Sequence, residues 1–324
     1  MENRIEYLDI LRGLCMVWII WYHTEHPEFV NYPFFNTTLF FVSGIFFKTY
    51  SWDVFYRKKL NRMVIPLLFF YLLYYVFLLF INYVKYHQIS TDIANTVWDL
   101  FRLYTGNDAF TVNYPLWFLC ALLVLQFIVY GLSKCIKSPF LLIVISFMVS
   151  LGGYFYIQWI PTPFMIGRSL PYLIYFVIGY VFKDYWLNKR KLISGRNIII
   201  PINLILFISS ILIQQKSVIP FINIILHYLE LITVCIILLY ICLYLQRFMI
   251  LNKFFVYWGM NSLIAFGLHD MFLTVFRIIF ENCGFQMNIV TGVLCCIGTL
   301  TLLWSSTHFL QKYFPYCVGK KDIV

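Results

Sequence analysis

Residues 64–82 of the sequence read VIPLLFFYLLYYVFLLFIN and contain no charged side chain. An α-helix rises about 1.5 Å per residue, so about 20 apolar residues are needed to cross the hydrocarbon core of a bilayer. This stretch has that length and that composition. It therefore predicts a membrane-spanning helix, and similar runs recur along the rest of the chain.

The composition of the whole chain agrees with this interpretation. Its 324 residues are 62% hydrophobic and 12% charged, and the mean hydropathy is +0.80. A soluble domain is closer to half apolar and a quarter charged, so soluble enzymes, nucleic-acid-binding domains and disordered proteins are excluded. An outer-membrane barrel would show short segments of alternating polarity instead of long apolar runs. The chain is therefore predicted to be an all-α, polytopic membrane protein.

About ten transmembrane helices are expected from the apolar runs. They are predicted at 7–24, 33–48, 64–82, 115–133, 139–159, 164–182, 197–215, 219–245, 254–275 and 288–310. The second run is short and contains Thr, and the sixth includes Arg168 and Pro171, so these two are the weakest. The stretch 49–62 mixes aromatic and basic residues and suits an interfacial helix.

The charge distribution gives an orientation. The net charge is +10, and a cytoplasmic N-terminus places 19 of the 24 Lys and Arg inside and five outside. Removing either weak helix would move the following basic loops to the wrong side. We therefore expect both termini in the cytoplasm and the loop 83–114 outside. Residues 1–324 are expected to form a single domain in the cell inner (cytoplasmic) membrane, with membrane lipids and no nucleic acid as partners.

The nine cysteines do not predict a metal site or a disulfide framework. They include no C-x-x-C pair, and most lie within apolar runs. Free cysteines in such positions behave as small buried apolar residues. We expect no metal, and no covalent acyl-enzyme on Cys or Ser.

Two ionisable residues lie on one side of the first predicted helix. Arg12 and His23 are eleven residues apart, which is about three turns and roughly 16 Å of rise. An arginine near the cytoplasmic mouth can hold phosphates, and a deeper neutral imidazole can act as a base. Taken alone, the pair favours a plainer interpretation, in which Arg12 anchors the helix beside Asp9 and His23 is an interfacial residue.

The pair is followed by an ordered series of motifs. They are YLDILRG at 7–13, FFVSG at 40–44, RKKLNRMVIP at 57–66, LWFL at 116–119, YFVIGY at 175–180, and GMNSL at 259–263 leading to His269. This order, over residues 4 to about 270, resembles the integral-membrane acyltransferase 3 family, especially members that O-acetylate sugars.

The resemblance implies an acyl donor, usually acetyl-CoA, that enters from the cytoplasm, and an acceptor that is often a sugar hydroxyl outside. It implies His23 and His269 as catalytic residues and Arg12, Lys59 and Arg62 as donor-binding residues. Lys59 stands where the family usually has arginine, so the charge is kept but the bidentate fork is lost. The positive-inside rule by itself accounts for at least half of the charges at 57–62.

Three further residues are candidates for the site, and Ser43 and Trp117 carry two interpretations each. Ser43, beside Gly44, favours close helix packing over a nucleophilic role. Trp117 belongs to either an aromatic belt or the site, and Glu25 is close enough in sequence to orient His23.

The sequence as a whole predicts a membrane O-acyltransferase. Acetyl would pass from acetyl-CoA to a hydroxyl of a cell-surface or lipid-linked glycan, with His23 accepting the proton. The alternative is a multi-pass transporter or flippase of sugar-containing lipids, although the chain lacks paired broken helices and an internal repeat. The acceptor stays open. We expect no esterase-like domain, so the protein is expected either to act alone or to pass the acyl group to a separate extracytoplasmic transferase.

Overall fold

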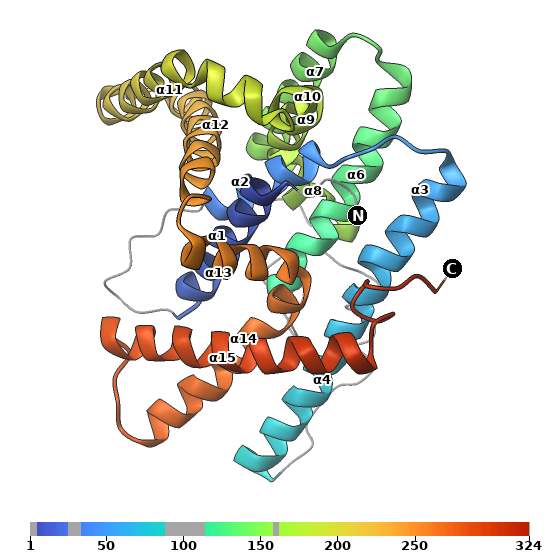
Figure 1. Ribbon diagram of the computed structural model, residues 1–324, viewed down its shortest axis with the longest axis vertical. Coiled ribbons are helices and arrows are strands. Elements are labelled where there is room, and N and C mark those ends of the chain that lie inside the picture. The colour runs from blue at the N-terminus through green and yellow to red at the C-terminus, as the bar shows by residue number, and fades with distance from the viewer. Residues whose placement is uncertain (1–4, 25–33, 88–113, 158–161, 324) are drawn as a thin grey trace. The chain divides into compact units, whose positions relative to one another are not determined.

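The computed structural model describes residues 5–24, 34–87, 114–157 and 162–323. Throughout these ranges every regular element is a helix and none is a strand (Figure 1). The predicted all-α class is therefore confirmed. The predicted outer loop 83–114 falls largely on residues 88–113, which lie outside the described ranges, as does Glu25.

The α-helices follow the predicted apolar runs closely. They are α1 (Glu6–Tyr22), α2 (Phe34–Ile45), α3 (Trp52–Lys59), α4 (Ile65–Tyr86), α6 (Trp117–Cys135), α7 (Pro139–Gly152), α8 (Ile166–Ser169), α9 (Leu173–Val181), α10 (Lys183–Trp186), α11 (Lys189–Lys216), α12 (Pro220–Leu245), α13 (Met249–Met260), α14 (Ser262–Asn282) and α15 (Ile289–Tyr313). A π-helical turn (Leu60–Val64) joins α3 to α4, and a second one (Gly153–Ile157) continues α7. Short 3-10 turns lie at Tyr114–Leu116, Pro163–Met165 and Leu170–Tyr172.

Six helical stretches of the described chain are long and apolar enough to cross a membrane. They are Trp52–Val84, Tyr114–Cys135, Lys189–Lys216, Pro220–Leu245, Ser262–Asn282 and Ile289–Tyr313. This result agrees with a polytopic membrane protein. The count of ten spans and the cytoplasmic placement of both termini stay predictions.

Two predicted ranges differ in detail from the structure. The run 254–275 is divided, because α13 ends at Met260 and α14 begins at Ser262. Asn261 lies between them with φ −108° and ψ 15°, and its Oδ1 accepts a hydrogen bond of 2.5 Å from Gln311 Nε2. The predicted interfacial stretch 49–62 is helical from Trp52 and continues without a break into the following span, as part of Trp52–Val84. Its location at the membrane interface stays a prediction.

The chain divides into two compact units. The first unit contains residues up to Val17, α2, and α9 to α13 from Ile174 to Met260. The second unit contains the end of α1 from Trp18, the helices α3 to α8, and everything from Asn261 onward. Whether they act as one functional domain, as the sequence predicts, stays a prediction.

Paired glycines hold the first unit together. A methyl group on Gly44 of α2 would lie 1.9 Å from the Phe176 carbonyl oxygen of α9, and one on Gly179 of α9 would lie 2.1 Å from the Phe41 oxygen. No side chain fits at such a distance, so only glycine lets the two backbones approach. The motifs FFVSG and YFVIGY are therefore two halves of one packing contact. The hydroxyl of the neighbouring Ser43 is bonded within α2, where its Oγ donates to the Leu39 carbonyl oxygen at 2.7 Å.

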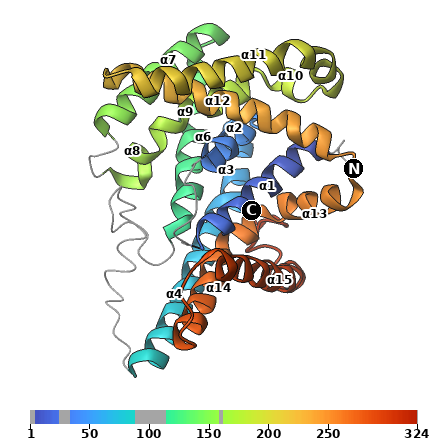
Figure 2. The same cartoon turned by 90° about the vertical axis from the view of Figure 1, so that its left-hand side faces the viewer.

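In the second unit α14 packs against both α4 and α15 (Figures 1 and 2). Gly267 of α14 faces the Phe70 ring of α4, where an added methyl group would meet ring atoms at 2.4 Å. This close approach sets the position of the following turn of α14, which carries His269.

Candidate active site

His269 is a buried imidazole with a defined tautomer. Its side chain is fully buried, and its Nδ1 lies 2.9 Å from the Phe266 oxygen and 3.2 Å from the Ala265 oxygen. Carbonyl oxygens only accept, so Nδ1 carries the proton and Nε2 presents its lone pair. Within the described residues, this Nε2 has no hydrogen-bond partner. It is therefore an acceptor available to another group.

His23 lies directly beside His269. The centroids of the two rings are 5.2 Å apart, and the ring planes are inclined by 51°. His23 follows the last residue of α1, and its backbone N–H donates to the Ile19 oxygen at 3.0 Å, so the helical pattern continues through it. The structure thus brings together the two histidines predicted as catalytic, from the first helix and from α14.

Arg277 attaches the end of α1 to α14. Its Nη2 donates to the His23 carbonyl oxygen at 2.6 Å. From the sequence alone, Arg277 is expected only to be one of the five basic residues on the outer side of the membrane. Its role as a clamp on His23 depends on a backbone contact between distant segments, which no spacing rule reveals.

A second polar pair lies one residue after His269. The Tyr74 hydroxyl of α4 donates to Asp270 Oδ2 at 2.7 Å, and Tyr74 is 5% exposed. Asp270 itself is half-buried, and its carboxylate therefore has a donor from a buried side chain of the neighbouring helix. The sequence does not single out Tyr74 as a site residue, because α4 contains several other tyrosines in the same apolar run.

The LWFL motif reaches the histidine pair through one aromatic neighbour. The Phe118 ring lies 5.4 Å from the Phe266 ring, which lies 5.8 Å from the His269 ring. Trp117 is 6% exposed, and the Arg168 guanidinium lies 4.1 Å above its ring. Phe118 is thus the motif residue nearer to the imidazoles along this chain of rings, and Trp117 contacts Phe118 with ring centroids 6.2 Å apart.

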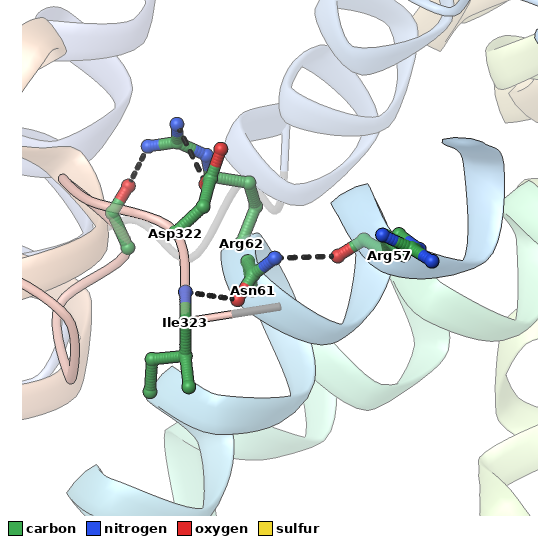
Figure 3. Close-up of polar contacts among 6 residues, drawn as sticks. Arg57, Asn61, Arg62, Asp322 and Ile323 are labelled. Atoms are coloured by element: carbon green, nitrogen blue, oxygen red, sulfur yellow. Dashed lines mark hydrogen bonds and ion pairs between the residues drawn. The ribbon is translucent and has the colours of Figure 1, made fainter. Parts of the chain in front are cut away.

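The basic motif carries Arg62 on the π-helical turn, in contact with the segment that follows α15. Arg62 Nη2 pairs with Asp322 Oδ1 at 3.0 Å, and its Nη1 donates to the Gly319 oxygen (Figure 3). The neighbouring Asn61 accepts from the Ile323 backbone N–H at 2.8 Å and donates to the Arg57 oxygen at 3.0 Å. Residues 319–323 therefore lie across the basic motif, and a carboxylate already engages the predicted donor-binding arginine.

The other two predicted donor-binding residues have different surroundings. Lys59 is half-buried, with its ammonium 5.0 Å from the centre of the Phe55 ring. Arg12 lies in the first unit, where its Nη1 is 3.7 Å from Asp9 Oδ1. The pairing with Asp9 expected from the i,i+3 spacing is thus present. The described residues hold no group of three His, Cys, Asp or Glu able to bind a metal ion.

Comparison with known proteins adds one finding. Residues 5–308 match the family model described as an acyltransferase domain, Acyl_transf_3. Neither a curated protein nor a solved structure matches the chain.

Proposed function

Because the chain belongs to the acyltransferase 3 family, we propose that it is a membrane O-acyltransferase that moves acetyl from acetyl-CoA to a glycan hydroxyl. The glycan is at the cell surface or linked to a lipid, and the protein resides in the inner (cytoplasmic) membrane. The observation that carries the proposal is the pair of adjacent imidazoles, one of which presents a free lone pair.

In the proposed chemistry, His23 accepts the proton of the acceptor hydroxyl while its oxygen attacks the thioester carbonyl. The carbon–sulfur bond then breaks, and the proton leaves with the coenzyme A thiolate. His269 supports His23, because its Nε2 lone pair is available to the second N–H of the imidazolium that forms. A fixed neutral acceptor beside the base stabilises the positive charge at the moment it appears.

Arg277 gives the base its position. Its hydrogen bond to the His23 carbonyl oxygen holds the end of α1 against α14. Effective general-base catalysis requires the accepting nitrogen within hydrogen-bond reach of the hydroxyl, so a small displacement of His23 would slow the reaction.

The donor is proposed to be held by Arg62 and Lys59 of the second unit. Arg62 supports this assignment because its guanidinium binds a carboxylate while the side chain stays 48% exposed. A phosphate of coenzyme A carries more charge than a carboxylate and suits the planar guanidinium fork. Donor binding would therefore replace Asp322 on Arg62. The assignment of Arg12 as a donor-binding residue stays a prediction.

The test is acetyl transfer from radiolabelled acetyl-CoA by the purified protein in nanodiscs, with glycolipid extracted from the native membrane as acceptor. Labelled glycolipid together with free coenzyme A supports the proposal. Transport of the glycolipid with no thioester cleavage would instead favour a transporter, an alternative to which the family match gives no support.

A further inference from the structure

A groove of about 480 Å3 lies between α11 and α12 of the first unit, and none of its lining residues belongs to the candidate active site. One wall is a stripe of α11 that includes Lys189, Ile193 and Arg196. The other wall includes Tyr240 and Leu243 of α12, and Arg247 just beyond that helix. The groove is therefore basic at its rim and apolar at its base.

The three basic residues of the rim face no carboxylate across the groove, since none of its lining residues is acidic. The partners recorded for two of them are neutral. Lys189 Nζ donates to Gln246 Oε1 at 2.8 Å, and the Arg247 guanidinium lies 5.3 Å from the centre of the Tyr244 ring. Three cations on one small rim repel one another, so the groove favours an anionic occupant.

The start of α11 points to the same ligand chemistry. The helix begins with Lys189, Arg190 and Lys191, and its first turn contains no acidic residue. Cations at this end oppose the helix dipole, whose positive pole lies at the N-terminus. A bound anion would relieve both the mutual repulsion of the rim and this unfavourable interaction.

The apolar part of the groove identifies the anion as a lipid. Tyr240 at the base is 8% exposed, whereas outward residues farther along α11, such as Ile198 and Ile205, are 67% and 66% exposed. Since α11 is long and apolar enough to cross the membrane, this outward face suits contact with acyl chains. A soluble phosphate compound would leave that face unused, whereas a lipid would place its phosphate on the rim and a chain along the helix.

We propose that the groove between α11 and α12 is a binding site for an anionic phospholipid. The phosphate contacts Lys189, Arg196 and Arg247, and an acyl chain lies against Ile193 and Leu243. The predicted orientation puts these basic residues at the cytoplasmic surface, where anionic headgroups are available. The proposal does not depend on the acyltransferase reaction.

Native mass spectrometry of the detergent-purified protein tests the site, with phosphatidylglycerol and phosphatidylcholine titrated separately. One variant carries Lys189→Ala, Arg196→Ala and Arg247→Ala. A control with Lys134→Ala, Lys137→Ala and Lys253→Ala removes the same charge from exposed residues that do not line the groove. We expect the wild-type protein and the control to retain phosphatidylglycerol over phosphatidylcholine, and the groove variant to lose at least about tenfold in affinity for it.

A second variant, Ile193→Trp, fills the groove and keeps every charge. It tests the lipid site even if the triple variant does not fold. It is expected to reduce phosphatidylglycerol binding to the same extent. Inorganic phosphate and coenzyme A serve as soluble competitors and should leave the bound lipid in place. Any one of four results would overturn the proposal. The control variant could lose as much affinity for phosphatidylglycerol as the groove variant, or the wild-type protein could retain phosphatidylcholine as well as phosphatidylglycerol. Alternatively, Ile193→Trp could bind phosphatidylglycerol fully, or either soluble competitor could displace the bound lipid.

Discussion

His23 and His269 come from the first helix and from α14, yet their ring centroids lie 5.2 Å apart. The backbone fixes the proton of His269 on Nδ1, so its Nε2 can serve only as an acceptor. His23 is bound at its carbonyl oxygen by Arg277. One imidazole is thus fixed in tautomer and the other is fixed in place.

Replacing His269 by Phe should lower turnover and leave donor binding unchanged. Phe keeps a planar ring but removes the Nε2 acceptor, and a hydrogen bond to a charged group is worth about 1.5–3 kcal/mol, or roughly 10- to 150-fold. His269→Gln, which retains an acceptor oxygen, should recover part of the rate. The rate effects of His269→Phe and His23→Ala should not add, because both act on one proton transfer. Additive losses would show that His269 acts independently.

Arg277→Leu should reduce kcat about tenfold without changing KM for acetyl-CoA, because it removes the hydrogen bond that positions the base. Arg277→Lys, which keeps a donor, should be intermediate. The same variants should increase amide exchange at residues 19–23, measured by hydrogen–deuterium exchange mass spectrometry. A purely structural role would be revealed by a loss of folded protein with no selective effect on kcat.

Arg62→Ala should raise KM for acetyl-CoA roughly 10- to 150-fold, since one charge-assisted contact to a phosphate is lost. Asp322→Asn should do the opposite. The side chains of this ion pair are 48% and 56% exposed, so its worth is about 0.2–1 kcal/mol and KM should fall by no more than about fivefold.

The exposed Asp53→Asn is a matched control for Asp322→Asn and should leave KM unchanged. In an Arg62→Ala background, Asp322→Asn should also have no effect. If Arg62→Ala binds donor normally, the arginine is only a topological anchor. If Arg62→Ala raises KM as expected but Asp322→Asn leaves KM unchanged, Arg62 binds the donor and the proposed competition by Asp322 is wrong.

Gly44→Ala should lower the stability of the folded protein, whereas Gly131→Ala should be tolerated. The added methyl group would lie 1.9 Å from the Phe176 oxygen at position 44, and nothing lies within 4 Å of it at position 131. Overpacking typically costs about 1–3 kcal/mol, and backbone atoms cannot yield as side chains do. Thermal unfolding of both variants in detergent measures the difference, and equal stabilities would contradict the observed packing of α2 on α9.

The helix class and most helix ranges follow from the sequence, because the length and polarity of apolar runs are local properties. The division at Asn261 does not, and the contact of Asn261 with Gln311 in another helix is not a local property of the sequence. The histidine pair is expected from the motif resemblance, but its surroundings are not. Tyr74 and Arg277 lie in apolar helices as ordinary residues, and only the tertiary contacts with Asp270 and His23 distinguish them.

The position of the segment after α15 could not be predicted from the sequence either. Its Asp322 and Gly319 have no pattern that predicts contact with Arg62, far earlier in the chain. Long-range polar contacts of this kind depend on how helices pack, which periodicity does not encode.

The most direct measurement of the central claim is the initial rate of acetyl transfer by purified His23→Ala protein, with its coenzyme A affinity determined on the same preparation. General-base assistance contributes about 10²–10⁴-fold, so turnover should fall by that factor while the dissociation constant for coenzyme A stays within about twofold. Turnover equal to that of the wild-type protein, in a folded preparation that binds coenzyme A normally, would contradict the assignment of His23 as the base.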